Sequence, residues 1–273
     1  MTSHAQDRTR EFRRLHEPGQ LLLLANAWDA GSARLIESCG ASAIATTSAG
    51  LAWSRGYPDG DALPAGVLAA AVAEIARVLT VPLSVDVEGG YSSDPRAVGE
   101  VVSAVIDAGA VGINIEDGSA PPDALRAKIA AARTAASRAG VALFINARTD
   151  VYLRGLVPAA GREAETIARA AAYSESGCDG VFVPGLVDAQ AIGTIAAAIA
   201  APLNVMLLPS LPPLARMREL GVRRVSAGSK IAQAAHGLTR RAAMSLLQEG
   251  RLDDAMFEGA AEYGELNALF RAT

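Results

Sequence analysis

The chain has 273 residues, enough for one large domain, and its 51% hydrophobic and 20% charged residues are typical of a protein that folds around an apolar core. This composition excludes a disordered chain and a collagen-like repeat. The net charge of −4 offers no basic surface for nucleic acid or for an anionic membrane, so we expect neither as a partner. The expected partner is a small molecule.

The N-terminal sequence favours a cytoplasmic location. Residues 1–19 are mostly polar and lack the apolar segment of a secretory signal. No apolar run in the chain approaches the roughly 18 residues that a bilayer span requires. We therefore expect no contact with a membrane.

The predicted elements begin with a polar helix over about Ala5–His16. After it, short apolar or β-branched segments alternate eight times with alanine-rich segments whose apolar residues recur at the helical intervals of three and four. The clearest helix is Asp94–Ala108, where Asp94 can cap the first turn and Pro95 suits the first position. Residues 239–273 are expected to form two or three short helices. The predicted strands are Leu21–Ala27, Ala43–Thr47, Pro82–Val87, Gly112–Glu116, Ala142–Arg148, Gly180–Val183, Pro202–Leu207 and Arg223–Ala227.

This alternation predicts a parallel sheet covered by helices, because parallel strands need crossover connections, which are nearly always right-handed. Eight such units fit a closed (β/α)8 barrel, the TIM-barrel fold of the α/β class. An open doubly wound sheet is the alternative, although no G-x-G-x-x-G motif follows the first strand. We expect one barrel domain over residues 1–273, with an N-terminal helix in 1–18 and a helical tail in 239–273.

Acidic side chains gather at the ends of the third, fourth and fifth predicted strands, where a barrel builds its active site. Asp86 and Glu88 are two residues apart and share a face of one strand, and Glu116 ends the next strand. Carboxylates this close together need a compensating cation. Because this set has no histidine or cysteine, its ligands are hard oxygens, which suit Mg²⁺ or Mn²⁺ rather than zinc. We predict a Mg²⁺ (or Mn²⁺) ion held by Asp86, Glu88 and Glu116.

Arg148 ends the fifth predicted strand at the same mouth of the barrel. Its guanidinium could neutralise the acidic cluster, bind a substrate carboxylate through two parallel hydrogen bonds, or do both. A purely structural ion pair is the alternative. Two further segments, Ser48–Asp61 and Ala227–Lys230, could bring backbone N–H groups close to an anion, although an ordinary connecting loop explains the first equally well.

The chain has few lysines and histidines, and their positions disfavour two classes of catalytic mechanism. Neither Lys128, on a helix, nor Lys230, beyond the last strand, is placed to form a Schiff base inside the barrel. His4 and His16 fall in the N-terminal segment and His236 on the last barrel helix, which disfavours a Ser-His-Asp hydrolase. Metal-assisted stabilisation of an enolate, formed when a bond next to the carbonyl of a 2-oxo acid breaks, is what remains.

Four segments resemble motifs of the isocitrate lyase/phosphoenolpyruvate mutase superfamily, in the family's order and at the expected strand ends. They are Ser48–Asp61, Asp86–Tyr91, Gly112–Asp117 and Ala147–Asp150, and the resemblance extends from about Leu21 to Ala235.

The resemblance implies roles for the acidic residues. Asp86 and Glu116 match metal-site carboxylates, and Glu88 stands where many members have another aspartate. In the family each of these commonly acts through a metal-bound water. Asp59 matches a further acidic residue near the metal, which makes it a catalytic candidate beside Arg148.

The resemblance also implies how a substrate is held. Arg148 matches the family's substrate-binding arginine. Ser48, Gly50 and Leu51 resemble the loop whose backbone and hydroxyl groups hold the substrate carboxylate. Members of the family tend to be tetramers that exchange the last barrel helix, so the resemblance implies a homotetramer of this kind.

The chain departs from the family after the fourth predicted strand. Lyases acting on isocitrate or 2-methylisocitrate carry a mobile loop there with a Lys-Arg-Cys-Gly-His or similar motif, and phosphonopyruvate enzymes usually carry a Lys-Thr-Asn-type sequence. Here Asp117 is followed by Gly-Ser-Ala-Pro-Pro and the next helix, so both motifs are missing. A short loop leaves the site wetter, and decarboxylation, which needs no acid-base lid, suits it.

The sequence therefore predicts a Mg²⁺-dependent lyase that cleaves the C–C bond next to the carbonyl of a small 2-oxo or 2-hydroxy carboxylic acid through an enolate, as in oxaloacetate decarboxylation. Two alternatives stay open. One is P–C bond mutase or hydrolase chemistry on phosphonopyruvate, with Ser229 and Lys230 recruited. The other is a non-catalytic member that binds a dicarboxylate without turnover.

Overall fold

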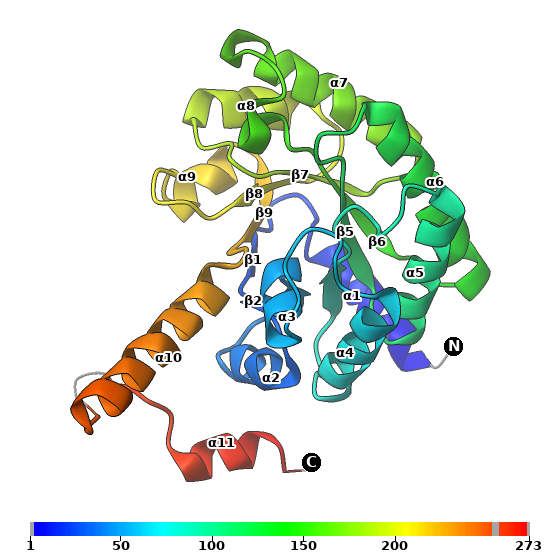
Figure 1. The fold of residues 1–273 in the computed structure, drawn as a ribbon. Helices are drawn as coiled ribbons and strands as arrows, with labels where there is room; N and C mark the ends of the chain where they lie inside the picture. The colour runs from blue at the N-terminus through cyan, green and yellow to red at the C-terminus, as the bar shows by residue number, and fades with distance from the viewer. Residues whose placement is uncertain (1–2, 253–256, 272–273) are drawn as a thin grey trace.

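The computed structural model describes residues 3–252 and 257–271 of the chain. In this described part, nine strands form one sheet in the order β1-β9-β8-β7-β6-β5-β4-β3-β2, and every neighbouring pair is parallel. β1 (Leu22–Leu24) and β2 (Asn26–Ala27) are consecutive pieces of the first predicted strand, and they pair with β9 and β3. The first strand thereby brings the two ends of the sheet together (Figure 1). The prediction of a (β/α)8 TIM barrel is confirmed.

The other strands lie where the apolar segments predict them. Most of their side chains are buried, as expected for parallel strands with helices outside and a packed barrel inside. β5 and β7 match their predicted ranges, and β3, β4, β6 and β8 are shorter than predicted and lie within theirs. β9 begins and ends one residue earlier than predicted. These strands are β3 (Ile44–Thr46), β4 (Leu83–Asp86), β5 (Gly112–Glu116), β6 (Phe144–Arg148), β7 (Gly180–Val183), β8 (Leu203–Met206) and β9 (Val222–Ser226).

Helices surround the barrel between consecutive strands (Figure 1). The predicted helix Asp94–Ala108 is confirmed as α5 (Pro95–Asp107), and the Asp94 side chain accepts from the N–H of Arg96. The buried face of this helix consists of Val98, Val101, Val102, Val105 and Ile106. The other outer helices are α2 (Ala30–Ser38), α4 (Ala65–Arg77), α6 (Pro122–Ala139), α7 (Arg162–Glu175), α8 (Ala189–Ala198) and α9 (Leu214–Glu219).

The predicted N-terminal helix is α1 (Ser3–Arg14), which closes the end of the barrel where the strands begin. The ring of Phe12 is fully buried and packs edge-on against Phe144, the first residue of β6. Gly112 makes room for it, because a Cβ there would lie 2.6 Å from a ring carbon of Phe12. The ring of His16, just beyond the helix, stacks on Phe144 with ring centroids 4.0 Å apart.

Three segments differ from their predicted form. The segment from Ser48, expected as a loop, begins with a short helix, α3 (Ser48–Ser54). After β6 the chain forms a π-helical turn (Val151–Gly155) and a 3-10 turn (Ala159–Gly161) before α7. The predicted tail boundary at residue 239 is wrong, because α10 (Lys230–Glu249) runs through it as one helix.

The last helices stand apart from the barrel. α10 extends outward from the end of β9, and α11 (Tyr263–Leu269) follows it near α2 (Figure 1). Residues 253–256 and 272–273 of the predicted tail, and residues 1–2 of the predicted N-terminal segment, lie outside the described residues. Within the part that is described, no helix combines the length and the apolar character needed to cross a bilayer.

Candidate functional site

A cavity of about 110 Å³ opens at the end of the barrel where the strands finish. This is the end at which barrel enzymes place their chemistry. Four of the predicted site residues line the cavity, and they come from three βα units: Ser48 and Asp59 follow β3, Asp86 ends β4 and Arg148 ends β6. Its wall also contains the side chain of Asn114 from β5.

Arg148 is held in place by two carboxylates. Its Nε and Nη2 donate to the two oxygens of Asp150 at 2.7 and 3.1 Å, and its Nη1 lies 2.5 Å from Glu116 Oε2. Asp150 is fully buried, and Arg154 also donates to it at 2.7 Å. Burial alone would lower the pKa of Arg148, but Glu116 and Asp150 outweigh that effect and raise it, so the guanidinium stays charged.

The carboxylates around Arg148 carry more negative charge than one guanidinium balances. Burial raises the pKa of Asp86, with Arg148 opposing the shift and Asp59 adding to it. Burial also raises the pKa of Glu116 to about 8, opposed by Arg148 and reinforced by Asp86. The pKa of Glu88 is raised by burial as well. A site of this kind favours either proton uptake or an additional cation.

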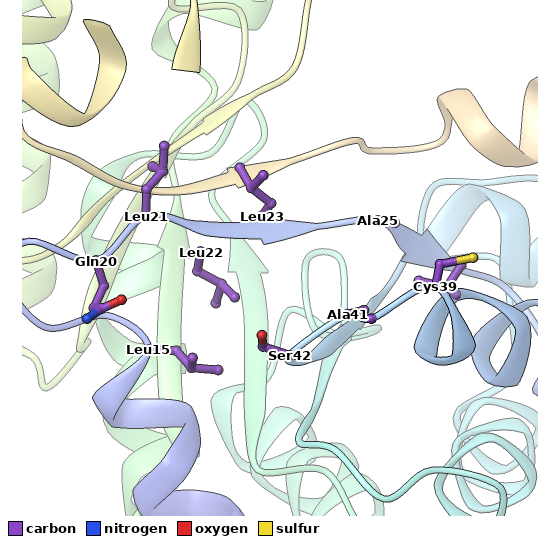
Figure 2. A pocket seen from close by; sticks show the side chains of 11 residues that line it. Leu15, Gln20, Leu21, Leu22, Leu23, Ala25, Cys39, Ala41 and Ser42 are labelled. Carbon is purple, nitrogen blue, oxygen red and sulfur yellow. The ribbon is translucent and has the colours of Figure 1, made fainter. Parts of the chain in front are cut away.

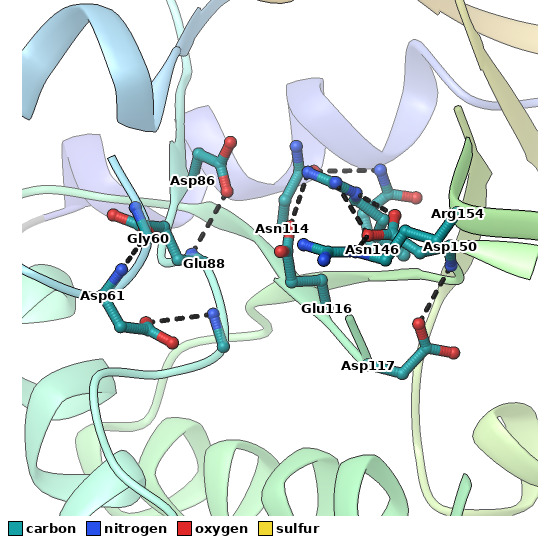
Figure 3. A network of polar contacts seen from close by, with 12 residues as sticks. Gly60, Asp61, Asp86, Glu88, Asn114, Glu116, Asp117, Asn146, Asp150 and Arg154 are labelled. Carbon is teal, nitrogen blue, oxygen red and sulfur yellow. Dashed lines mark hydrogen bonds and ion pairs between the residues drawn. The ribbon is translucent and has the colours of Figure 1, made fainter. Parts of the chain in front are cut away.

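Glu88 faces a neighbouring loop. Its backbone is in the left-handed region, with φ of 51°, and its carboxylate accepts from the N–H groups of Gly60, at 2.8 Å, and Asp61. Tyr91 donates its hydroxyl to the same carboxylate at 3.0 Å. In return Asp61 accepts from the N–H groups of Gly89 and Tyr91. These reciprocal bonds, part of which Figure 3 shows, fasten the loop that carries Asp59 beside the end of β4.

The predicted metal ligands therefore lie at one mouth of the barrel without forming a ready-made cage. Among residues 3–252 and 257–271, no three His, Cys, Asp or Glu side chains converge to hold an ion. Glu88 is bonded to the loop and Glu116 to Arg148, whereas Asp86 faces the cavity. The donor set nevertheless fits Mg²⁺, because it consists of hard oxygens with raised pKa values and Mg²⁺ usually keeps several of its waters. Direct ligation by all three carboxylates stays a prediction.

Of the three residues predicted to form the substrate loop, only Ser48 lines the cavity. Ser48 lines the cavity at the start of α3. Gly50 and Leu51 are buried in the packing of that helix, and the Leu51 N–H is already donated to the Thr47 carbonyl at 3.0 Å. A Cβ on Gly50 would lie 2.9 Å from that of Trp28, so the glycine serves close packing. Contact of Gly50 and Leu51 with a substrate remains a prediction.

A buried network behind Arg148 was not predicted. The fully buried Asp117 accepts from the N–H of Asp150 at 2.9 Å, from Arg169 at 2.8 Å and from the Tyr173 hydroxyl at 2.7 Å. It therefore links Asp150, which orients Arg148, to Arg169 and Tyr173 of helix α7. Figure 3 shows the bond between Asp117 and Asp150. The sequence places Asp117 next to the strand end, but its partners lie 52 and 56 residues further on.

Asn114, in the cavity wall, is a second polar residue that was not predicted. It lies two positions before Glu116 on β5, and alternate residues of a strand share a face. Polar residues at alternate positions of a buried strand are the signal that would have identified it. The segment that carries Ser229, considered above for anion binding, also reaches the cavity, because Gly228 and Ser229 line it.

Several known proteins are similar to this chain over most of its length. An uncharacterized protein of Mycobacterium tuberculosis (strain CDC 1551 / Oshkosh), MT2054, is 40% identical over 80% of this chain and 81% of its own. The oxaloacetate decarboxylase of Paraburkholderia xenovorans is 29% identical over 96% of this chain and 93% of its own.

Solved structures share the fold. A predicted lyase/mutase from Burkholderia cenocepacia J2315 has a TM-score of 0.88 with 34% identity, covering 99% of this chain and 98% of its own. A phosphonopyruvate hydrolase, in complex with oxalate and Mg²⁺, has a TM-score of 0.80 over 96% of this chain and 94% of its own, and at 23% identity it shows a likeness of fold alone.

The family itself follows from a match over most of the barrel. Residues 12–247 match the model of the phosphoenolpyruvate phosphomutase family. The match includes the nine strands of the described sheet, most of α10, and the cavity with its acidic wall and arginine. The chain therefore belongs to the phosphoenolpyruvate mutase family, within the isocitrate lyase/phosphoenolpyruvate mutase superfamily.

Proposed function

We propose that the protein is a Mg²⁺-dependent lyase that cleaves a C–C bond at the carbon next to the carbonyl of a small 2-oxo or 2-hydroxy carboxylic acid, so that the electron pair of the broken bond forms an enolate. Oxaloacetate, which would lose CO₂ to leave pyruvate, is the substrate that fits best. The similarity to an oxaloacetate decarboxylase over nearly the whole chain supports this choice.

The arrangement of Arg148 is the observation that carries the proposal. Two N–H groups of Arg148, on Nε and Nη2, donate to Asp150, and Nη1 forms an ion pair with Glu116. A guanidinium has five N–H groups, so these contacts leave donors on Nη1 and Nη2 for a ligand, and an arginine can bind a carboxylate through two such groups. Arg148 also lines the cavity, so this pair would hold the carboxylate of an entering acid.

The acidic residues give the cavity its second function. Asp86, Glu88 and Glu116 would hold Mg²⁺, each directly or through a bound water, and Asp59 lines the cavity with Asp86 as a further acidic residue near the ion. Bound Mg²⁺ would polarise the carbonyl oxygen of the acid and offset the charge of the carboxylates. The phosphonopyruvate hydrolase of the same fold, crystallised with oxalate and Mg²⁺, supports this cofactor.

The size of the site and its short loop fit a small substrate. The cavity of about 110 Å³ is well below the volume usual for drug-sized ligands. Only residues 117–121 separate β5 from α6, so this connection is too short to form a long lid over the cavity. Decarboxylation needs no acid from such a lid, because the departing CO₂ leaves its electron pair on the enolate.

A panel of acids tests the function. Purified protein with Mg²⁺ is given oxaloacetate, 2-methylisocitrate, malate or phosphonopyruvate, and pyruvate, succinate and phosphate are measured. The proposal expects pyruvate from oxaloacetate, a rate at least about a hundredfold lower in Asp86→Ala, and loss of activity with EDTA. Equal rates in wild type and Asp86→Ala would refute it.

The same panel decides the alternative P–C bond chemistry. Ser229 lines the cavity next to Lys230, which favours a phosphonate as the second candidate. Phosphate released from phosphonopyruvate, without pyruvate from oxaloacetate, would establish that reaction instead. Binding of the acids without any product would identify a non-catalytic binding protein.

We infer that the protein assembles by exchanging α10, in a homotetramer. A groove of about 440 Å³ runs beside β1 and α2, lined by Leu21, Leu23 and Ile36 among others (Figure 2). Leu23 is 48% exposed although it lies on a barrel strand. Within α10, all of which is described, only Ala232 and Ser245 are buried. The helix that should cover this part of the barrel therefore points away from it, and α10 of a second copy would fill the groove.

A further inference from the structure

We propose that Asn114 presents a fixed N–H donor to the cavity and uses it to bind the substrate oxygen on which negative charge develops. This inference rests on the proposed function. It assigns to the enolate oxygen a protein group that is separate from Arg148 and from the carboxylates.

The argument begins at Asn204, on β8, where the direction of the side-chain amide is forced. Its Nδ2 donates to the carbonyl oxygens of Val205, at 2.9 Å, and Arg224, at 3.2 Å. Carbonyl oxygens only accept, so the nitrogen must face them and Oδ1 must face away. Oδ1 accordingly accepts from Asn146 Nδ2 at 3.0 Å.

The same reasoning fixes the orientation of the Asn114 side-chain amide inside the barrel. Asn146 Nδ2 donates to Asn114 Oδ1 at 2.9 Å, and Arg224 Nη2 donates to the same oxygen at 3.1 Å. A guanidinium has donors and no acceptor, so Asn114 must turn its oxygen toward Arg224. Its Nδ2 must then point the other way. The backbone carbonyls that accept from Asn204 and the guanidinium that donates to Asn114 therefore fix the orientation of the linked amides of Asn204, Asn146 and Asn114.

Arg224 is a strong anchor for this arrangement because it lies inside the barrel. It is 1% exposed, and the described residues offer no partner for its Nε and Nη1. Burial lowers the pKa of Arg224 to about 9, which keeps it charged at neutral pH. A buried cation on Oδ1 polarises the amide, and a polarised amide is a better N–H donor.

The free end of Asn114 faces the proposed chemistry. Within the described residues Nδ2 has no hydrogen-bond partner, and Asn114 lines the cavity with Asp86 and Arg148. Asn114 is also the register partner of Asp86 across β4 and β5. An acid held by Arg148 at its carboxylate would therefore meet this N–H beside the Asp86 carboxylate. A fixed donor aimed at a developing oxyanion stabilises the transition state without reorganisation.

Oxalate, a stable planar analogue of the pyruvate enolate, is the probe that tests the inference. Its Kd is measured by calorimetry with Mg²⁺ for wild type, Asn114→Asp and Asn114→Ala. Asn114→Asp keeps an acceptor for Arg224 and Asn146 but removes the N–H, so the thermal midpoint should not fall while binding weakens about tenfold or more. Asn114→Ala removes the N–H without adding charge and should weaken binding similarly.

Asn26→Asp is the matched control, because Asn26 lines the same cavity but has both ends of its amide engaged. Its Nδ2 donates to the Thr46 carbonyl at 2.9 Å and its Oδ1 accepts from Gly228 N–H at 3.0 Å. The control adds the same charge and should weaken oxalate binding less than Asn114→Asp. Equal Kd values for wild type and both Asn114 variants, or an equal loss in the control and Asn114→Asp, would overturn the inference alone. A wild type that neither binds oxalate nor converts any acid would overturn the proposed function, and this inference with it.

Discussion

Arg148 divides its N–H groups between the protein and the cavity, and this division makes its side chain hard to replace. A lysine at this position would keep the positive charge but would offer a single nitrogen in place of a planar fork. Asp150 and Glu116 would then compete with a ligand for one ammonium group. Replacing Arg148 by lysine should therefore weaken ligand binding while leaving the net charge of the site unchanged.

For Arg148→Lys we expect the Kd of oxalate with Mg²⁺, measured by calorimetry, to rise about tenfold or more, since hydrogen bonds to charged groups contribute about 1.5–3 kcal/mol. Arg154→Lys is the matched control, because Arg154 bonds the same Asp150 from a position that is 50% exposed. The control should change the Kd less than threefold, roughly the effect of a surface ion pair. Similar changes in both variants would argue against a direct contact between Arg148 and the ligand.

Asp117 tests the network that supports Arg148. Asp117→Asn leaves the buried Arg169 without a full counter-charge on this side, and it should lower the free energy of unfolding by about 3 kcal/mol. Denaturant titration measures the change. Asp7→Asn breaks an exposed ion pair with Arg10 on α1 and should change the free energy by less than about 0.5 kcal/mol. A small effect at Asp117 would show that the network adds little to stability.

Helix α1 and His16 together cover the end of the barrel where the strands begin. The burial of His16 there makes the free energy of unfolding depend on pH. Burial first, and then the charge of Arg224, lower the pKa of His16 to about 3, while its Nδ1 is bonded to the Phe12 carbonyl. Between about pH 6.5 and pH 3, His16 therefore stays neutral in the folded chain but is protonated in the unfolded chain. The stability that comes from the neutral ring is present above that pH and is lost as the pH falls toward 3.

His16→Phe should remove this component, because phenylalanine keeps the aromatic contact with Phe144 but does not titrate. Free energies of unfolding are compared for both proteins at pH 7, 5.5 and 4.5. Below pH 6.5 the wild type should lose up to about 1.4 kcal/mol per pH unit more than the variant. Parallel curves across this range would contradict the burial of a neutral His16.

The strands were predictable as elements because their signal is local. An apolar run between two helical segments marks a buried parallel strand, and β5 and β7 match their predicted bounds. The short helix α3 was missed, because its central Gly50 is unfavourable in an isolated helix. Packing of Gly50 against Trp28 and Ala232 compensates, and those residues come from other parts of the chain.

The proposed assembly of the whole molecule depends on α10, which extends away from its own barrel (Figure 1). The proposed exchange predicts that apolar residues on this helix hold the assembly together. Leu246 and Leu247 are 52% and 83% exposed in a single chain. The double variant Leu246→Glu/Leu247→Glu should elute as a monomer in size-exclusion chromatography with light scattering, and the wild type is expected to elute as a tetramer.

The neighbouring Gln248→Glu supplies the control, because it adds charge at an exposed polar position without removing an apolar contact. It should retain the wild-type mass. A wild type that is monomeric at all concentrations would refute the exchange. A double variant that stays tetrameric would show that these two leucines are not in the interface.

The sequence by itself determined the barrel and the end at which its polar residues gather. Both follow from local rules: the spacing of apolar residues identifies each element, and the end of each strand identifies the mouth. Asp86, Asp59, Ser48 and Arg148 therefore lie around one cavity, as their positions after the strands indicate.

Only the tertiary structure decided what each side chain bonds. Glu88 turns to Gly60 and Asp61 because a left-handed backbone and a neighbouring loop offer it N–H groups. Asn114 points its nitrogen at the cavity because Arg224, 110 residues away in the chain, occupies its oxygen. Such pairings depend on contacts across the barrel, and the local sequence pattern contains no record of which distant donor meets which acceptor.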